Sequence, residues 1–192
     1  MTLRNALDGV PETSGEAVFT LWFMGRPAAG KTTLAGAVAD RLAAQGYDVE
    51  NLDGDDLREQ LHPELGFSRE DRRVNNRRTA YIAKLLNRHD VVTVVGMITP
   101  FAAARAQARE IVEEEGEFVL VYARCPVEVA EERDPKGLYE AARNGQVERF
   151  TGIDHPFEEP ADPDVVVDTV ACAPAESVDH VVDRLGDLGL LG

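Results

Sequence analysis

A glycine-rich run near the amino terminus has the spacing of a loop that binds phosphate. It fits the pattern G-x4-G-K-[ST], and it lies between an apolar segment, residues 18–24, and a helical pattern over residues 32–45. In such loops, the glycines let backbone amides point inward, the lysine ammonium contacts the β- and γ-phosphates, and the hydroxyl can ligate Mg²⁺. The sequence therefore predicts a P-loop that binds a Mg-nucleoside triphosphate. The predicted nucleotide-binding residues of this loop are Gly25, Arg26, Pro27, Ala28, Ala29, Gly30, Lys31, Thr32 and Thr33.

Two acidic residues, Asp53 and Asp55, come at the end of a second expected strand, residues 47–52. A carboxylate at such a strand end can order Mg²⁺ and accept the proton of an attacking hydroxyl. The alternative is a surface turn, because Asp-Gly-Asp is also a common turn sequence. The later apolar segments, 91–97 and 118–123, end without an acidic residue, and the chain has no N-K-x-D sequence. These features favour a kinase over a GTP-dependent switch or a motor.

Arginines are concentrated between residues 58 and 78 of an otherwise acidic chain, at Arg58, Arg69, Arg72, Arg73, Arg77 and Arg78. Some of them are expected to form surface ion pairs with Glu70 and Asp71 along a helix. A phosphate or sulfate group needs forked cationic donors, so we expect at least two of these arginines in a binding site. Asn75, which lies among them, could read a ribose or a base edge.

A long segment rich in glycine, proline and charge, about residues 133–160, carries Arg133 and Lys136. It is expected to be a mobile lid that closes on the phosphates and excludes water, although an ordinary surface loop is the alternative. Phe67 and Phe150 lie in polar, glycine-containing runs. They are candidates to stack on an adenine ring, and otherwise they would fill the core.

Apolar runs and helical patterns alternate along the chain, which predicts an α/β fold with a parallel sheet and right-handed crossovers. The expected strands are 18–24, 47–52, 91–97, 118–123 and 165–167, and the expected helices are 32–45, 69–88, 102–114, 127–132 and 175–187. The predicted architecture is a P-loop NTPase-type three-layer sandwich with about five strands. We expect residues 1–16 to be a flexible leader and residues 17–192 to be a single domain. Ligands of such sheets bind beyond the carboxyl ends of the strands.

The composition excludes several classes of partner. The 192-residue chain has a net charge of −15, from 35 acidic and 20 basic residues, so it repels nucleic acid and anionic membranes. No apolar run is long enough to cross a bilayer. We expect a cytoplasmic protein, and the lysine-poor acidic composition suggests a host with a salty cytoplasm. Cys125 and Cys172 are far apart, which is typical of incidental thiols.

Read together, these runs resemble the adenylyl-sulfate kinase (APS kinase) family, whose members use ATP to phosphorylate the 3′-hydroxyl of adenosine 5′-phosphosulfate. The resemblance covers about residues 19–168. Besides the P-loop it is carried by Leu52-Asp-Gly-Asp55 followed by Arg58, Leu65-Gly-Phe-Ser68, Glu70-Asp-Arg72 with Asn75 and Arg77-Arg78, Ile98-Thr-Pro-Phe101, Glu132-Arg-Asp-Pro-Lys-Gly-Leu-Tyr139 and Phe150-Thr-Gly-Ile-Asp154.

The resemblance implies a role for most of these residues. Catalysis would depend on Lys31, Asp53, Asp55 and Lys136, and Mg²⁺ would be held by Thr32, Asp53 and Asp55. Arg133 would lie near the ATP base. The acceptor would be bound by Arg58, Phe67, Arg72, Asn75, Ile98, Thr99, Lys136, Leu138 and Phe150. The implied substrates are ATP and adenylyl sulfate, with Mg²⁺ as cofactor, and a homodimer is expected.

The chain departs from the family pattern at a few positions. The family usually has Ser at the position of Thr99, which is associated with a phosphoserine, so Thr99 is a possible phosphorylation site. It usually has Tyr-Arg where Phe101 and Ala102 stand, and Ile where Asn76 stands. Two alternatives therefore stay open: a related P-loop kinase acting on another nucleotide or small anionic acceptor, and a non-catalytic nucleotide-binding regulatory domain.

Overall fold

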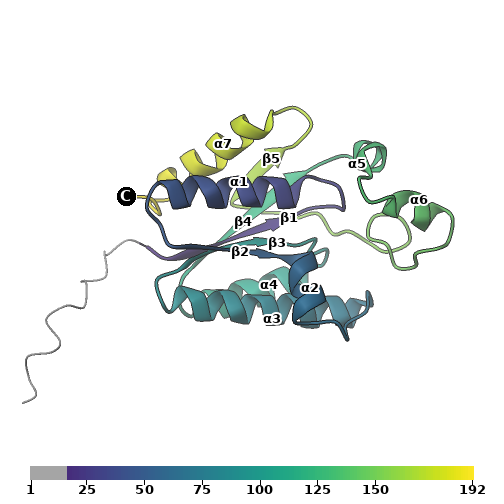
Figure 1. Ribbon diagram of the computed structural model, residues 1–192, viewed down its shortest axis with the longest axis horizontal. Coiled ribbons are helices and arrows are strands. Elements are labelled where there is room, and N and C mark those ends of the chain that lie inside the picture. Colours follow the sequence, from purple (N-terminus) through teal and green to yellow (C-terminus); the bar gives the residue numbers. More distant parts are fainter. Residues whose placement is uncertain (1–16) are drawn as a thin grey trace, which may run out of the picture.

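The computed structural model describes residues 17–192, so the leader predicted for residues 1–16 lies outside the described part of the chain. Its strands form one parallel five-stranded sheet in the order β2-β3-β1-β4-β5 (Figure 1). The strands are β1 (Phe19–Met24), β2 (Val49–Asp53), β3 (Val92–Gly96), β4 (Glu117–Arg124) and β5 (Val165–Asp168). The helices are α1 (Lys31–Ala44), α2 (Gly54–Gln60), α3 (Arg69–Asn87), α4 (Ala102–Val112), α5 (Val127–Arg133), α6 (Leu138–Arg143) and α7 (Pro174–Asp187).

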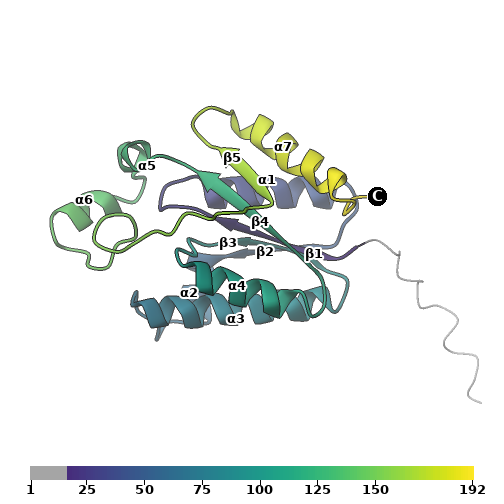
Figure 2. The same cartoon turned by 180° about the vertical axis from the view of Figure 1, so that it is seen from behind.

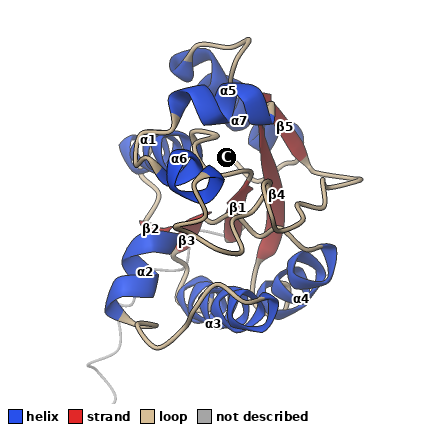
Figure 3. Ribbon diagram, turned by 90° about the vertical axis from the view of Figure 1, so that its right-hand side faces the viewer, coloured by secondary structure: helices blue, strands red, loops and turns tan. Residues whose placement is uncertain are grey.

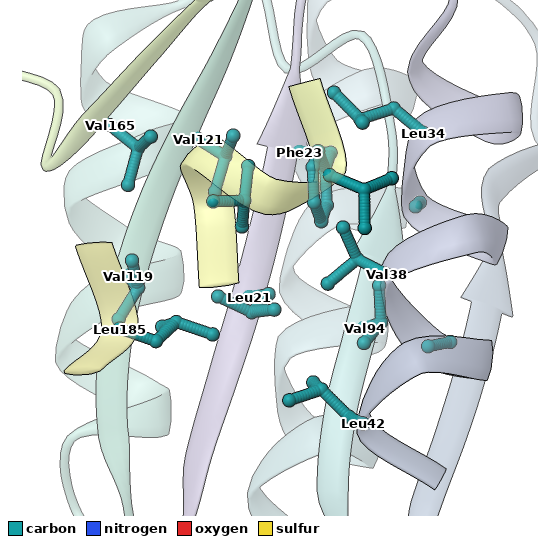
Figure 4. Packing of buried hydrophobic residues seen from close by; sticks show 14 of the residues in the cluster. Leu21, Phe23, Leu34, Val38, Leu42, Val94, Val119, Val121, Val165 and Leu185 are labelled. Carbon is teal, nitrogen blue, oxygen red and sulfur yellow. The ribbon is translucent and has the colours of Figure 1, made fainter. Parts of the chain in front are cut away.

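Helices cover both faces of the sheet, with α1 and α7 on one side and α2, α3 and α4 on the other (Figures 1 and 2). Every residue of β1 is buried, which explains why its sequence is a continuous apolar run rather than an alternating one. Figure 4 shows Leu21 and Phe23 of β1 packed near Val38 of α1 and Leu185 of α7. Trp22 belongs to the opposite cluster, which includes Ala80 of α3. The predicted three-layer sandwich is confirmed.

Because all five strands are parallel, their carboxyl ends lie along one edge of the sheet. Figure 3 views the molecule from this end, where α2, α5 and α6 lie. β1 occupies the centre, between β3 and β4, so the loop that leaves it emerges in the middle of this edge. The strand order thus places the glycine-rich loop where ligands of open parallel sheets bind. Within residues 17–192, no helix is both long enough and apolar enough to cross a membrane.

Two short helices were missed by the sequence analysis. Residues 54–60 form α2, where only the end of a strand and a possible turn were expected, because the Asp53 side chain caps the helix by accepting from the amides of Asp55 and Asp56. Residues 138–143 form α6 inside the segment predicted to be a loop. There the Asp134 carboxylate accepts from the backbone amides of Leu138, Tyr139 and Glu140. Both helices are too short to produce an apolar period, so only their capping residues could have revealed them.

The segment predicted to be a lid, residues 133–160, has a small apolar core of its own. Tyr139 and Phe150 are buried together, with ring centroids 4.8 Å apart in an edge-to-face arrangement. They pack with Ala29 of the P-loop and Ala123 at the end of β4. In the conformation described, the segment is therefore packed onto the P-loop rather than free in solvent. Its mobility stays a prediction.

Candidate active site

The backbone of the P-loop has the features that phosphate binding requires. A Cβ atom on Gly25 would lie 2.6 Å from the carbonyl oxygen of Ala123, so only glycine fits where the loop leaves β1. Gly30 has φ 86°, a left-handed conformation that glycine adopts without strain, and it directly precedes α1. The first turn of α1 has no side-chain cap and no acidic residue. Its amides and the positive end of its dipole therefore remain available to an anion.

Lys31 is buried at the start of α1, where it is 9% exposed, and its ammonium donates to the carbonyl oxygen of Arg26 over 2.7 Å. Burial lowers its pKa to about 8, against the opposing attraction of Asp55 and Asp53. The ammonium has lost much of its hydration without gaining an ion pair. A polyphosphate in the loop would supply the missing negative charge, so this group is preorganised for an anionic ligand.

Asp53 connects the P-loop to α2. One of its carboxylate oxygens accepts from the amide of Asp55 over 2.8 Å, and the other accepts from the Thr32 hydroxyl over 3.0 Å. The predicted metal-binding residues Thr32 and Asp53 are thus in direct contact, although they are 21 positions apart in the sequence. Oxygen donors of this kind are what Mg²⁺ prefers. Residues 17–192 contain no cluster of three or more His, Cys, Asp or Glu side chains that could hold a metal. The oxygen donors of Thr32 and Asp53 are compatible with Mg²⁺, and the binding of this ion stays a proposal.

The structure separates the arginine cluster into two groups. Arg73 forms an exposed ion pair with Glu70, as the surface alternative predicted, and Arg78 forms one with Glu64, a partner that was not predicted. Arg58 and Arg72 instead donate to backbone carbonyl oxygens. Burial lowers the pKa of Arg58, and it lowers the pKa of Arg72 to about 10. These two guanidinium groups lack carboxylate partners in the described structure, so they keep charge available for an anionic ligand.

The predicted acceptor residues Arg58, Phe67 and Arg72 are in contact with one another. The guanidinium carbons of Arg58 and Arg72 lie 4.8 Å and 5.5 Å from the centroid of the Phe67 ring, which is 52% exposed. Arg72 also donates to the carbonyl oxygen of Arg149, the residue before Phe150. Asn75 follows Arg72 by one turn of α3 and is buried, with its side-chain oxygen 2.6 Å from the Nδ1 atom of His62. Phe150 itself is 7% exposed, so it fills a core, as one of the two alternatives held.

Lys136 and Asp55 are two of the four predicted catalytic residues, and although they are distant in the sequence they form an ion pair of 2.5 Å. The hydrogen bond to Asp55 raises the pKa of Lys136. A second contact, from the Tyr139 hydroxyl to the carbonyl oxygen of Pro27 over 3.1 Å, attaches the same segment to the P-loop. Leu138, between these two contact residues, is 38% exposed. The segment 133–160 therefore reaches both the phosphate loop and the carboxylate side of the site.

Thr99 follows β3 and is 2% exposed, with the unusual backbone angle φ 41°. Its hydroxyl accepts from the indole nitrogen of Trp22 over 2.8 Å, and its carbonyl oxygen accepts from Arg105 over 3.1 Å. The hydroxyl is thus enclosed and already bonded in this conformation, and the suggestion that Thr99 is a phosphorylation site stays a prediction. Ile98, the preceding predicted acceptor residue, is partly buried.

Arg133 lies at the end of α5, where its guanidinium donates to the hydroxyl and the carbonyl oxygen of Thr169, just after β5. It is therefore on the β4–β5 side of the P-loop, whereas Arg58 and Arg72 are on the α2–α3 side. The nucleotide role of Arg133 and the acceptor roles of Arg58 and Arg72 stay proposals.

Some contacts that shape the site were not predicted from the sequence. Asp154 accepts from the amides of Arg149 and Phe150, and these bonds lower its pKa. Arg26 stacks on Phe157, 4.5 Å from the ring centroid, and pairs with Glu159. An aspartate a few residues after a glycine-flanked aromatic is a weak signal of a turn. The Arg26 contacts had no local signal at all, because their partners are more than 130 positions away.

The sequence profile of the adenylylsulphate kinase family matches residues 17–168. This chain belongs to the adenylyl-sulfate kinase family. The family predicted from the sequence is confirmed, and the matched range contains every predicted site residue.

Individual relatives agree with this family assignment. The adenylyl-sulfate kinase of Halothermothrix orenii is 45% identical over 172 residues, which cover 90% of this chain and 91% of that protein. The structure of the Mycobacterium tuberculosis APS kinase CysC in complex with AMPPNP and APS has a TM-score of 0.86 and 37% identity, covering 89% of this chain and 99% of that one. A hexameric APS kinase from Thiobacillus denitrificans has a TM-score of 0.71 and 30% identity, covering 92% of this chain but 30% of that chain.

The buried Lys31 ammonium is expected to lower the folding stability of the nucleotide-free chain while it favours binding of an anionic ligand. Since its pKa falls from 10.5 to about 8 on folding, the folded chain holds its proton less tightly than the unfolded chain. The buried charge therefore lowers the free energy of unfolding below pH 8, and this loss of stability disappears as pH rises from 8 to 10.5. The shift corresponds to about 3 kcal/mol at most, from which the lost bond to Arg26 must be subtracted. We expect Lys31→Met to raise the thermal unfolding midpoint of the nucleotide-free chain by about 4 °C at neutral pH.

Thermal unfolding from pH 7 to 10 checks this expectation, and the difference between wild type and variant should shrink as pH rises. Lys84→Met is the matched control, because Lys84 is also buried but pairs with Glu114. That control should be destabilised. A Lys31→Met protein that is less stable than wild type at neutral pH would contradict the assignment of a desolvated, unpaired charge.

The exposed Lys136–Asp55 pair predicts that a substitution of Lys136 lowers activity but hardly changes folding stability. Both side chains are largely exposed, at 63% and 75%, so the pair contributes little to folding stability. We expect Lys136→Ala to lower kcat/KM for the acceptor by about 100-fold and to leave the unfolding midpoint within about 2 °C of wild type. Arg143→Ala, which removes another exposed ion pair of the same segment, should keep near-normal activity. Equal activity losses in the two variants would assign the effect to the segment as a whole.

Proposed function

We propose that this chain transfers the terminal phosphoryl group of ATP to the 3′-hydroxyl of adenosine 5′-phosphosulfate, giving 3′-phosphoadenylyl sulfate and ADP. Two kinds of support combine. The chain belongs to the adenylyl-sulfate kinase family, and relatives of about 45% identity bear that name over most of its length. The described site also has separate features for a polyphosphate and for a second anionic ligand.

The observation that carries the proposal is the position of α2, which lies between the P-loop and the acceptor-side arginines. At its first residue, the helix is capped by Asp53, which bonds Thr32 of the P-loop. In its first turn it presents Asp55, and near its end it presents Arg58, which contacts Phe67. A single seven-residue helix thus joins the phosphate loop, the candidate base and the acceptor-side arginines. This is the arrangement that direct transfer between two bound nucleotides requires, because both substrates must meet over the carboxylates.

In this mechanism each residue acts on a stated group. The amides of the P-loop and Lys31 bind the β- and γ-phosphates, and Arg58 and Arg72 hold the acceptor, with Phe67 against its base. Asp55 accepts the proton from the 3′-hydroxyl, and Lys136 stabilises the charge that is transferred. Residues 133–160 exclude water, which keeps the phosphoryl group from hydrolysis. Phosphoryl transfer needs little covalent chemistry from the protein, so positioning and charge are sufficient.

We also propose Mg²⁺ as the cofactor. Thr32 and Asp53 would hold it, either directly or through water, and Asp55 is near enough in sequence to contribute. When bound, the ion would neutralise phosphate charge. The contact between the Thr32 hydroxyl and the Asp53 carboxylate supports the proposal, because it brings together two hard oxygen donors beside the phosphate loop.

An acceptor series tests the proposed function. The chain is incubated with MgATP and, separately, adenylyl sulfate, AMP or unphosphorylated nucleosides, and ADP formation is followed. We expect turnover with adenylyl sulfate only. Turnover with another acceptor would favour the related kinase, which Phe101 and Ala102 keep open, since the family usually has Tyr-Arg there. Nucleotide binding without any turnover would favour a regulatory domain.

Lys31→Ala gives a second test in the same assay. Loss of the buried ammonium should lower kcat by about 100- to 1,000-fold, because its positive charge stabilises the negative charge of the transition state. Arg41→Ala, an exposed change on the same helix that removes an ion pair with Asp179, is the control and should be silent. Near-normal turnover by Lys31→Ala would contradict the role assigned to the P-loop lysine.

The cellular setting is proposed from the charge and the substrates. ATP is the proposed phosphoryl donor, which fits a cytoplasmic enzyme, and a homodimer is the expected assembly. A net charge of −15 opposes the compact state by self-repulsion, and salt screens that repulsion. We therefore expect the unfolding midpoint to rise between about 0.1 M and about 1 M KCl. A midpoint that does not respond to salt would argue against adaptation to a salty cytoplasm.

A further inference from the structure

His62 is a buried polar residue to which the mechanism above gives no role. It lies in the turn after α2 and is 3% exposed. The turn is fixed by backbone bonds, because the amide of His62 donates to the carbonyl oxygen of Leu57, and the amide of Leu65 donates to the carbonyl oxygen of His62. The backbone that carries the ring is therefore held in place by these two bonds.

The partner of His62 is the side chain of Asn75, which belongs to the proposed acceptor site. Nδ1 of the ring lies 2.6 Å from Oδ1 of Asn75, and Asn75 is 2% exposed. An amide oxygen can only accept a hydrogen bond, so Nδ1 must carry the proton in this contact. Oδ1 thus faces the His62 ring, and the Nδ2 group is the part of the amide that makes no hydrogen bond within residues 17–192. Asn75 lies one turn of α3 after Arg72, so a ligand that accepts from Nδ2 would be bound beside the acceptor-side guanidinium.

We propose that His62 is a positioning residue that fixes the orientation of the Asn75 amide, so that Asn75 donates a hydrogen bond to the acceptor nucleotide. The inference rests on the proposed function, in which Asn75 binds adenylyl sulfate. The group that it recognises is a hydrogen-bond acceptor on the nucleotide: a base nitrogen or an oxygen of the ribose, phosphate or sulfate.

The physical basis is the coupling between the ring tautomer and the amide orientation. With the proton on Nδ1, the ring pairs with Oδ1 and leaves Nδ2 free. If the neutral ring carried its proton on Nε2 instead, Nδ1 would accept from Nδ2, and Oδ1 would become the free end. A ligand atom that accepts from Nδ2 in the first state would face a carbonyl oxygen in the second. The buried His62 ring thus decides whether the same asparagine attracts or repels a given atom of the acceptor.

A pair of variants separates positioning from simple packing. His62→Leu keeps an apolar side chain of similar size but removes the donor, whereas His62→Asn retains an N–H donor at about the position of Nδ1. We expect His62→Leu to raise KM for adenylyl sulfate by about tenfold, without a matching change in KM for ATP. His62→Asn should restore most of the loss. An unchanged KM for adenylyl sulfate in a folded His62→Leu protein would overturn the inference, as would equal increases in both KM values.

The tautomer can be measured on the wild-type chain, which keeps the inference testable if His62→Leu does not fold. Long-range ¹H–¹⁵N correlation spectra distinguish protonated from unprotonated ring nitrogens, and the spectrum of His62→Asn identifies the His62 signals among those of the four histidines. We expect the proton on Nδ1 both before and after adenylyl sulfate is added. A ring protonated only on Nε2 would overturn the inference.

The same assays distinguish failure of this inference from failure of the proposed function. If the wild-type chain does not phosphorylate adenylyl sulfate, the proposed function fails and this inference fails with it. If it does, but Asn75→Ala keeps a normal KM for adenylyl sulfate, only the role of the His62–Asn75 pair is overturned. A raised KM in Asn75→Ala and in His62→Leu, with recovery in His62→Asn, supports the inference.

Discussion

The carboxylate of Asp53 is the interaction on which the arrangement of the site depends. One oxygen holds the first amides of α2, and the other holds the Thr32 hydroxyl at the start of α1. Because the two helices lie on opposite faces of the sheet, this single side chain joins the two outer layers at the carboxyl edge (Figure 3). Helix α2, capped by Asp53, carries Asp55 and Arg58. Asp53 thus links the P-loop to α2 directly, and residues 133–160 add further contacts to the P-loop, to Asp55 and to Arg72.

The site is an exception to the electrostatics of the rest of the molecule. The chain as a whole is strongly acidic, yet Lys31, Arg58 and Arg72 are partly or fully withdrawn from water, and their pKa values are lowered by burial. Each of these charges is held by carbonyl oxygens rather than by an ion pair. An anionic substrate approaching this protein meets long-range repulsion, and it is attracted only where these desolvated cations are concentrated. Local geometry, and not net charge, thus makes the site attractive to nucleotides.

The sequence predicted the sheet and the P-loop well because their signals are local. Buried parallel strands such as β1 are continuous apolar runs, and the Gly25–Thr32 spacing is dictated by backbone curvature alone. The pairing of Arg73 with Glu70 was also predictable from helical spacing. What could not be predicted were contacts set by tertiary packing: the Tyr139 hydroxyl on Pro27, the enclosure of Thr99 by Trp22, and the His62–Asn75 bond. Thr99 is the clearest case, because its hydroxyl chemistry is visible in the sequence while its burial is not.

The three lysines of the chain have a practical consequence for anyone who labels this protein. Lys31 and Lys84 are each 9% exposed, whereas the side chain of Lys136 is 63% exposed. Amine-directed reagents such as succinimidyl esters need an accessible amine, so Lys136 is the lysine side chain that they would modify first. Any attachment through a lysine side chain would consequently occur mainly at the residue that pairs with Asp55. The exposed thiol of Cys172 offers a different point of attachment.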